Sequence, residues 1–316
     1  MDSVITTVTP NPAIDITYTV NSIHRGESNR VQSVADRAGG KGLNVARVLH
    51  RCGAATAVTG LFGGDSGRWI LNELFTAGIA VEPTLISESS RRTVTVVEDA
   101  KSHSATVLNE RGPTTTLAEW NALYANVATL LHRSTVLVVS GSIPPGSEPD
   151  ALSPLIVAAR DAGVPCIVDT TGPTLLASAR AGATLLKPNI DELREAFDVD
   201  IRTHDEIVTT ARKLVALGAR GVVVSLGAEG MLGVDDEHVY WCPAIAGVSG
   251  NPTGAGDAAV AGLAQALADK GDWTMLLRNA VSFGAAAVLA PEAGDVAPDA
   301  IERFLQAAHP TALTPS

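Results

Sequence analysis

A glycine-rich turn with an adjoining carboxylate, Gly254-Ala255-Gly256-Asp257, leads directly into an Ala- and Leu-rich stretch that ends near Leu267. This pattern predicts a helix whose first backbone N–H groups lack partners and carry the positive end of the helix dipole. Anions, and phosphates above all, bind at such helix ends. Asp257 is then placed to take a proton from a group that attacks a phosphoryl group. The alternative is that Asp257 only caps the helix and that the glycines form a tight turn.

A second glycine-rich loop, Gly39-Gly40-Lys41-Gly42, precedes another helical stretch that carries Asn44. It is not a P-loop, because the GxxxxGK[ST] spacing is absent. The glycines permit close approach of the backbone to a ligand. Lys41 offers a cation, and Asn44 offers both a donor and an acceptor. An ordinary helix start with a solvated lysine is the alternative interpretation.

Two further segments carry groups suited to a sugar phosphate. Asp15, in Asn11-Pro12-Ala13-Ile14-Asp15, is able to accept two hydrogen bonds from vicinal sugar hydroxyls, or it simply forms a turn. Arg91-Arg92 opens a strand-like run, where a guanidinium suits phosphate recognition or protects a sheet edge. The formal net charge is −11, which argues against nucleic acid and membranes as partners. A phosphorylated substrate therefore needs local cations of this kind.

Composition favours an α/β enzyme of the cytoplasm. The chain has 316 residues, of which 46% are hydrophobic, which is enough for a large core. Cys52, Cys166 and Cys242 are too widely spaced for a zinc or redox motif. No apolar run approaches the length of a membrane span, and no secretory signal is recognisable at the start of the sequence.

Short apolar runs alternate with polar loops and helical stretches along most of the chain. The predicted strands are Val136–Val139, Cys166–Val168, Thr184–Leu186 and Val222–Val224. This alternation predicts βαβ units and a mostly parallel sheet flanked by helices. Ligands bind beyond the carboxyl ends of such strands, which is where the loops beginning at Ser140, Asp169, Lys187 and Ser225 lie.

Two regions, at about 15–36 and 91–109, instead alternate polar and apolar residues and contain turn-like loops. Strict alternation predicts half-exposed antiparallel strands. Two such hairpins suggest a small sheet that forms a lid over the active site. One face would point toward the substrate and the other toward solvent or a second subunit. The tail Pro310–Ser316 is predicted to be frayed.

Six motifs, in order, resemble those of PfkB-type carbohydrate kinases of the ribokinase superfamily, and more narrowly its 1-phosphofructokinase and tagatose-6-phosphate kinase-like members. They are Asn11–Asp15, Gly39–Arg47, Ser140–Gly146, Lys187–Leu193, Ser225–Gly230 and Gly254–Asp257. The resemblance covers nearly the whole chain. It implies a single ribokinase-like α/β kinase domain over residues 1–316, with the two hairpins as its lid.

The resemblance also implies ATP- and Mg²⁺-dependent phosphorylation of a ketohexose phosphate. Asp257 would be the general base, and the amides of Gly254, Ala255 and Gly256 would form the anion hole. The implied substrate-binding residues are Asp15, Gly39, Gly40, Lys41, Asn44, Arg92 and Ser140. The implied nucleotide-binding residues are Lys187, Asn189, Ser225, Gly227 and Gly230. Glu192 would position Mg²⁺, mostly through water.

Several alternatives stay open at this level. The expected reaction converts fructose 1-phosphate to fructose 1,6-bisphosphate. Fructose 6-phosphate and tagatose 6-phosphate are the alternative candidates for the substrate. A non-catalytic sugar-phosphate-binding regulator on the same fold is the alternative from a different class. Related kinases often carry Arg-x-Asn on the lid strand, which Arg92-Thr93-Val94 lacks, and Arg91 is the alternative phosphate ligand. A homodimer through the lid is expected.

Overall fold

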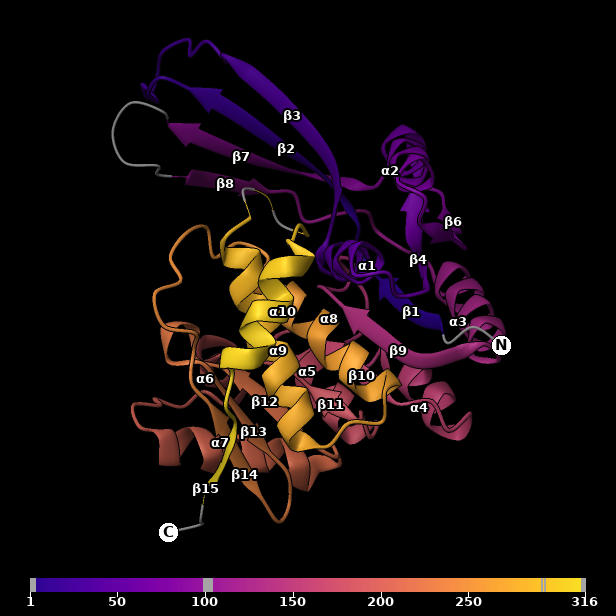
Figure 1. Ribbon diagram of the computed structural model, residues 1–316. Coiled ribbons are helices and arrows are strands. Elements are labelled where there is room, and N and C mark those ends of the chain that lie inside the picture. Colours follow the sequence, from indigo (N-terminus) through magenta and orange to yellow (C-terminus); the bar gives the residue numbers. More distant parts are fainter. Residues whose placement is uncertain (1–3, 99–104, 291, 293, 314–316) are drawn as a thin grey trace.

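A large, mostly parallel sheet forms the centre of the molecule in this computed structural model, which describes residues 4–98, 105–290, 292 and 294–313 (Figure 1). Its strand order is β15-β14-β13-β12-β11-β10-β9-β1-β4-β5, and β6 also pairs with β4. The strands are β1 (Val4–Thr9), β4 (Thr56–Gly63), β5 (Ala80–Val81), β6 (Thr84–Ile86), β9 (Ser134–Ser140), β10 (Cys166–Asp169), β11 (Leu185–Leu186), β12 (Val222–Ser225), β13 (Met231–Val234), β14 (Val239–Cys242) and β15 (Thr311–Leu313).

The predicted parallel units are confirmed, since β9, β10, β11 and β12 are parallel neighbours. The strands from β13 to β15 continue the sheet in antiparallel fashion at one edge. The prediction of a frayed tail was wrong for Thr311–Leu313, because this segment pairs with β14.

Helices cover both faces of the sheet, because its strands bury side chains on both sides. In β9, Val136 and Val138 pack into one core while Leu137 and Val139 pack into the other. The first core contains residues of α1 (Lys41–Arg51), α8 (Ala255–Ala268), α9 (Trp273–Val288) and α10 (Pro298–Ala307). The second contains residues of α3 (Leu117–Leu131), α4 (Ser153–Asp161), α5 (Gly172–Arg180), α6 (Ile190–Phe197) and α7 (His204–Leu217). No helix within the described residues is long and apolar enough to cross a membrane.

A second, four-stranded sheet projects from the body of the molecule (Figure 1). Its order is β3 (Ser33–Gly39), β2 (Ala13–Val20), β7 (Arg91–Glu98) and β8 (Ala105–Asn109). Both pairs, β2–β3 and β7–β8, are antiparallel as predicted. The two hairpins join through a parallel pairing of β2 with β7. The sequence predicts a connection at residues 98–103 between β7 and β8; Glu98 ends β7, and residues 99–103 lie outside the described residues. Helix α2 (Gly64–Thr76) packs beside the base of this sheet.

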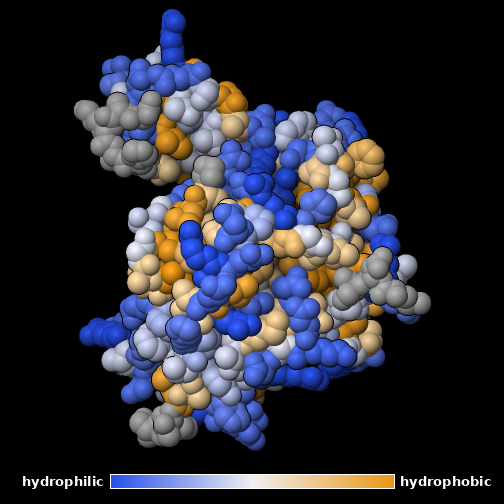
Figure 2. Space-filling model, viewed as in Figure 1, coloured by the Kyte–Doolittle hydropathy of each residue, from blue (hydrophilic) through white to orange (hydrophobic). Residues whose placement is uncertain are grey.

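The register of the small sheet gives it one polar and one apolar face. Asp15 lies opposite Thr93, while Ile16 lies opposite Val94, which in turn lies opposite Leu108. Side chains alternate between the faces of a sheet, so Asp15 and Thr93 share one face and the three apolar residues share the other. Figure 2 shows hydrophobic atoms at the surface of the projecting sheet.

Candidate active site

Asp257 lies in the first turn of α8, but it does not cap the helix. Gly254 is the N-cap residue, with a φ of 82° in the left-handed region that favours glycine, and no side chain caps the helix. The Asp257 side chain points into the protein and is only 7% exposed. The Asn44 amide donates a 2.8 Å hydrogen bond to its Oδ2 atom. The interpretation of Asp257 as a simple cap is therefore wrong.

The surroundings of Asp257 suit a base that gains and loses a proton near neutral pH. Burial, together with the charge of Asp169, raises the pKa of Asp257 to about 7. The hydrogen bond from Asn44 and the ammonium groups of Lys41 and Lys187 act in the opposite direction on this pKa. A general base works best when its pKa is close to the working pH.

The start of α8 presents free amides to the same space. Among the described residues, the backbone N–H groups of Gly254, Gly256 and Asp257 have no hydrogen-bond acceptor. Ala255 differs from the prediction, because its amide donates to the Pro252 carbonyl at 3.1 Å and is not free in this conformation. Free amides at a helix start bind anions.

A buried carboxylate that the sequence reasoning did not select, Asp169, lies next to this helix end. It follows directly on β10, and its side chain is 1% exposed. Lys41 Nζ lies 3.1 Å and Lys187 Nζ 3.7 Å from its Oδ1 atom, and the Ser140 hydroxyl donates to its Oδ2 atom at 3.3 Å. Although burial opposes it, the two ammonium groups hold the pKa of Asp169 below its usual range. Its position at the carboxyl end of a buried strand was the signal that could have identified it.

Lys187 connects Asp169 with the start of α8. Its side chain is 4% exposed. A Cβ atom added to Gly256 would lie 3.6 Å from Lys187 Nζ, so the ammonium lies close to the free amides of the helix. The Lys187 ammonium therefore lies next to both the Asp169 carboxylate and the free amides at the start of α8.

Lys41 points toward Asp169 and Glu192. Its Nζ atom lies 3.5 Å from Glu192 Oε1. Although burial lowers it, the carboxylates of Asp169 and Glu192 raise the pKa of Lys41 above its ordinary value, so the side chain is charged. Glu192 and Asn189 form a capping box at the start of α6, with hydrogen bonds of 2.8 and 2.9 Å. Asn189 also forms an isolated parallel bridge with Ser225.

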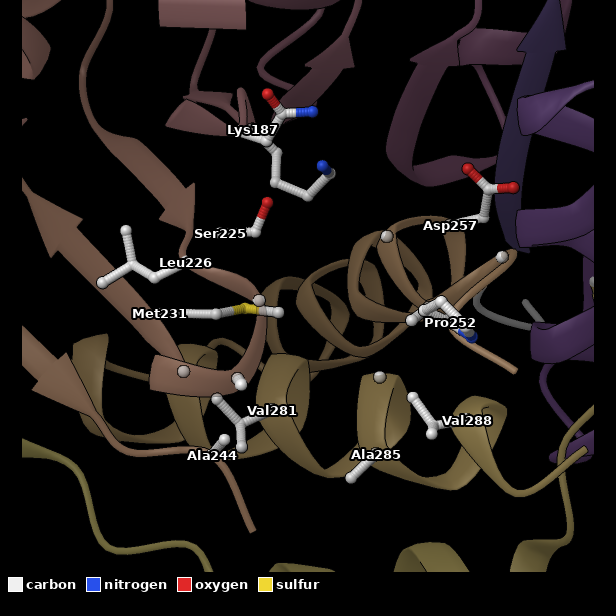
Figure 3. A pocket seen from close by; sticks show the side chains of 18 of the residues that line it. Lys187, Ser225, Leu226, Met231, Ala244, Pro252, Asp257, Val281, Ala285 and Val288 are labelled. Atoms are coloured by element: carbon white, nitrogen blue, oxygen red, sulfur yellow. The ribbon is translucent and has the colours of Figure 1, made fainter. Parts of the chain in front are cut away.

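These groups line one end of a pocket of about 940 Å³ (Figure 3). Lys187 and Asp257 mark its polar end, and Ser225 lies beside Lys187. The remaining wall is apolar and consists mainly of Leu226, Met231, Ala244, Val281, Ala285 and Val288. Gly227 and Gly230 lie in the β12–β13 turn at the edge of this wall. The pocket therefore combines a polar end, which holds charged side chains and free amides, with an apolar wall.

A second group of predicted residues lies at the base of the small sheet. A Cβ atom added to Gly39 would lie 1.9 Å from Asp15 Oδ2, so only glycine fits beside this carboxylate. Gly40 has a φ of 112° and precedes α1. Burial raises the pKa of Asp15, while the Arg91 guanidinium and the Thr93 hydroxyl lower it.

The structure places Arg91, and not Arg92, beside Asp15. Arg91 Nη1 donates to the Thr93 hydroxyl at 3.2 Å, and its Nε atom donates to the Asn11 carbonyl at 3.2 Å. Arg92 is exposed and belongs to the opposite face of β7. If the expected Arg-x-Asn pattern is counted from Arg91, its third residue is Thr93, which offers a hydroxyl in place of an amide.

Comparisons with known proteins identify similar kinases over almost the entire chain. Residues 8–300 match the family model described as pfkB family carbohydrate kinase. A tagatose-6-phosphate kinase from Staphylococcus epidermidis is 30% identical over 308 residues, which cover 96% of this chain and 97% of that protein.

Two solved structures are also similar. Phosphofructokinase-2 from Escherichia coli, in complex with potassium, has a TM-score of 0.90 at 29% identity, covering 97% of this chain and 99% of that one. A Thermotoga maritima protein named "possible 1-phosphofructokinase" has a TM-score of 0.87 at 25% identity, covering 98% of this chain and 100% of that one. The predicted ribokinase-like fold is confirmed.

Proposed function

The chain belongs to the pfkB family of carbohydrate kinases, and on that premise we propose that it transfers the γ-phosphoryl group of ATP to a ketohexose phosphate. The expected substrate is fructose 1-phosphate, and the product is then fructose 1,6-bisphosphate. The observation that carries this proposal is the position of Asp257. It lies at the free end of α8, in the phosphate end of the pocket, and is bonded to Asn44.

On the nucleotide side, the adenine ring packs on the apolar wall of the pocket and the phosphates point to the start of α8. The free amides of Gly254 and Gly256, together with Lys187, stabilise the charge that develops on the transferring phosphoryl group. Ser225, Gly227 and Gly230 border the nucleotide at the β12–β13 turn.

The carboxylates of the pocket fit a magnesium ion that arrives with the nucleotide. Among the described residues, no group of three acidic, His or Cys side chains is able to hold a metal alone. Mg²⁺ commonly takes one or two carboxylates and completes its shell with water and substrate phosphates. Glu192 would hold it through water, with Asp169 nearby.

On the sugar side, Asp15 accepts hydrogen bonds from sugar hydroxyls beside the backbone of Gly39 and Gly40. We assign the substrate phosphate to Arg91, because its guanidinium lies near Asp15 and that of Arg92 does not. Ser140 was expected to bind the substrate; because its hydroxyl donates to Asp169, we propose that it holds that carboxylate.

Asp257 then acts as the general base. One carboxylate oxygen takes the proton of the attacking sugar hydroxyl while Asn44 holds the other. The hydroxyl oxygen attacks the γ-phosphorus of ATP, the bond to the β-phosphate oxygen breaks, and ADP leaves.

Two further candidate substrates come from the names of similar proteins: tagatose 6-phosphate from the Staphylococcus epidermidis kinase, and fructose 6-phosphate from a structure of Escherichia coli phosphofructokinase-2 in complex with that sugar. An ADP-release assay with fructose 1-phosphate, fructose 6-phosphate, tagatose 6-phosphate and unphosphorylated fructose separates them. We expect the highest kcat/KM with fructose 1-phosphate and very low turnover of fructose. A preference for unphosphorylated fructose would contradict the role of Arg91.

We further propose that the whole chain acts as one kinase domain and that the small sheet is its lid. The polar face of the sheet, which carries Asp15 and Arg91, covers the sugar. The apolar face, which carries Val94 and Leu108, pairs with a second copy to form a homodimer. Leu108 is 59% exposed in the single chain, and burying such side chains favours association.

A further inference from the structure

Lys41 is the residue whose position departs most from the role that its motif implied. It is the first residue of α1, in the loop expected to bind sugar, yet its ammonium lies between two acidic side chains from other parts of the fold. These are Asp169, after β10, at 3.1 Å, and Glu192, in α6, at 3.5 Å. Among the ion pairs of the described residues, Glu192 has Lys41 as its sole partner.

The two carboxylates depend on this ammonium for their charge balance. The Asp169 side chain is 1% exposed and that of Glu192 is 12% exposed, so water screens them weakly. Of these two carboxylates, Lys187 pairs with Asp169, at 3.7 Å, and forms no described ion pair with Glu192. Without Lys41, two carboxylates would face an open pocket with one cation between them. Oxygen ligands of this kind attract divalent cations.

We propose that Lys41 is an internal counter-cation that keeps free divalent metal ions away from Asp169 and Glu192 until a magnesium–nucleotide complex binds. The incoming complex displaces the ammonium from the carboxylates. Because Lys41 lines the pocket and its side chain is 37% exposed, the released ammonium is able to bind the nucleotide phosphates. This inference rests on the proposed function, because it concerns the same pocket.

The test is a titration of the protein with Mn²⁺ alone, without nucleotide or sugar, in which electron paramagnetic resonance measures free Mn²⁺. The wild-type protein should show no saturable site below millimolar Mn²⁺. Lys41→Met should gain one site, with an affinity at least about tenfold higher, because a unit charge in direct contact is lost. Lys41→Gln, which keeps a polar side chain but removes the charge, is the second variant. It should gain the same Mn²⁺ site as Lys41→Met.

Three controls sharpen the result. Lys41→Arg keeps the charge and should resemble the wild type. Lys270→Met removes an exposed lysine elsewhere and should have no effect. The double variant Lys41→Met/Glu192→Gln should lose the gained site. Thermal melts establish that each variant folds.

Two results would overturn the proposal. One is a saturable Mn²⁺ site in the wild-type protein without nucleotide. The wild-type titration alone is therefore able to refute the proposal. The other is a folded Lys41→Met or Lys41→Gln protein without gained affinity. Because the titration contains no ATP and no sugar, failure of the kinase assay and failure of this inference are separate outcomes.

Discussion

At the scale of single residues, the pair formed by Asn44 and Asp257 links the two glycine-rich motifs of the sequence. Asn44 comes from α1 and Asp257 from α8, and their side chains meet at 2.8 Å in a buried position. The hydrogen bond favours the ionised form of a carboxyl group whose pKa burial raises to about 7. In the proposed function, this pair connects sugar binding by Asn44 with proton transfer by Asp257.

The first prediction concerns the pH dependence of catalysis. Asp257 must be ionised to accept a proton, so kcat/KM should rise with pH and reach half of its plateau near pH 7. Asn44→Ala removes the hydrogen bond that favours ionisation, so the pKa rises and the acid limb should move to higher pH. Asn72→Ala, on the surface of α2, is the control. An unchanged acid limb in Asn44→Ala would contradict the assignment.

A second prediction separates the adjacent arginines. Arg91→Ala should raise KM for the sugar phosphate by about 30-fold, because a hydrogen bond to a charged group contributes about 2 kcal/mol. Arg92→Ala should change this KM by less than about threefold, since its side chain is exposed on the other face. The measurement is steady-state kinetics at saturating ATP. Equal effects of the two variants would show that the faces of β7 are misassigned.

The residue types could be predicted from the sequence, but several of their partners could not. The motifs contain Asp257, Asn44, Asp15 and Lys187, all of which the fold brings to the pocket or the base of the small sheet. The choice between Arg91 and Arg92 depends on which face of a strand each one occupies, and neighbouring residues of one type give no signal for it.

At the scale of elements, the turn between β12 and β13 lies where two backbones approach closely at the edge of the main pocket. Gly230 has a φ of 102°, and a Cβ atom there would lie 2.1 Å from the Cys242 carbonyl oxygen. Gly227 has a φ of 59° with no atom within 4 Å of such a Cβ. The backbone conformation favours glycine at both positions, but only at Gly230 is there also no room for a Cβ atom.

The third prediction compares these two glycines. Gly230→Ala must push β14 or the turn aside, so it should raise KM for ATP by about tenfold, since small misplacements are costly at a binding site. Gly227→Ala has only the strain of a left-handed residue, about 1 kcal/mol, and should have a smaller effect. In thermal melts, Gly230→Ala should likewise be less stable than Gly227→Ala. The reverse order would contradict the geometry of the turn.

Element types were largely predictable, whereas contacts between distant elements were not. The alternation of polar and apolar residues predicted both hairpins of the small sheet. Their parallel pairing through β2 and β7 joins segments more than 70 residues apart, and local alternation contains no information about it. Asp169 was missed for a related reason, since its two ammonium partners belong to other elements: Lys41 begins α1, and Lys187 follows β11.

At the scale of the whole molecule, the projecting sheet explains how one chain could present a polar face to its substrate and an apolar face to a partner. Val34 and Leu108 lie on the apolar face and are 58% and 59% exposed. With a net charge of −11, the molecule repels anions in general. The guanidinium and ammonium groups of the site must therefore provide the local attraction for an anionic ligand.

The fourth prediction tests this arrangement. Leu108→Asp should convert the homodimer to a monomer, because it places a charge in an apolar interface. Leu85→Asp changes a leucine that is 70% exposed at the edge of the main sheet, and this control should remain dimeric. Light scattering after gel filtration gives the mass of each. A wild-type monomer, or a dimeric Leu108→Asp protein, would refute the lid interface.

The central claim is that Asp257 takes the proton during phosphoryl transfer, and Asp257→Asn tests it most directly. Asn has nearly the same shape and is still able to accept the hydrogen bond from Asn44. We predict a loss in kcat of about 10³-fold or more, with Kd values for the sugar phosphate and for the nucleotide changed by less than about threefold. A variant that keeps kcat within about tenfold of the wild type would contradict the account.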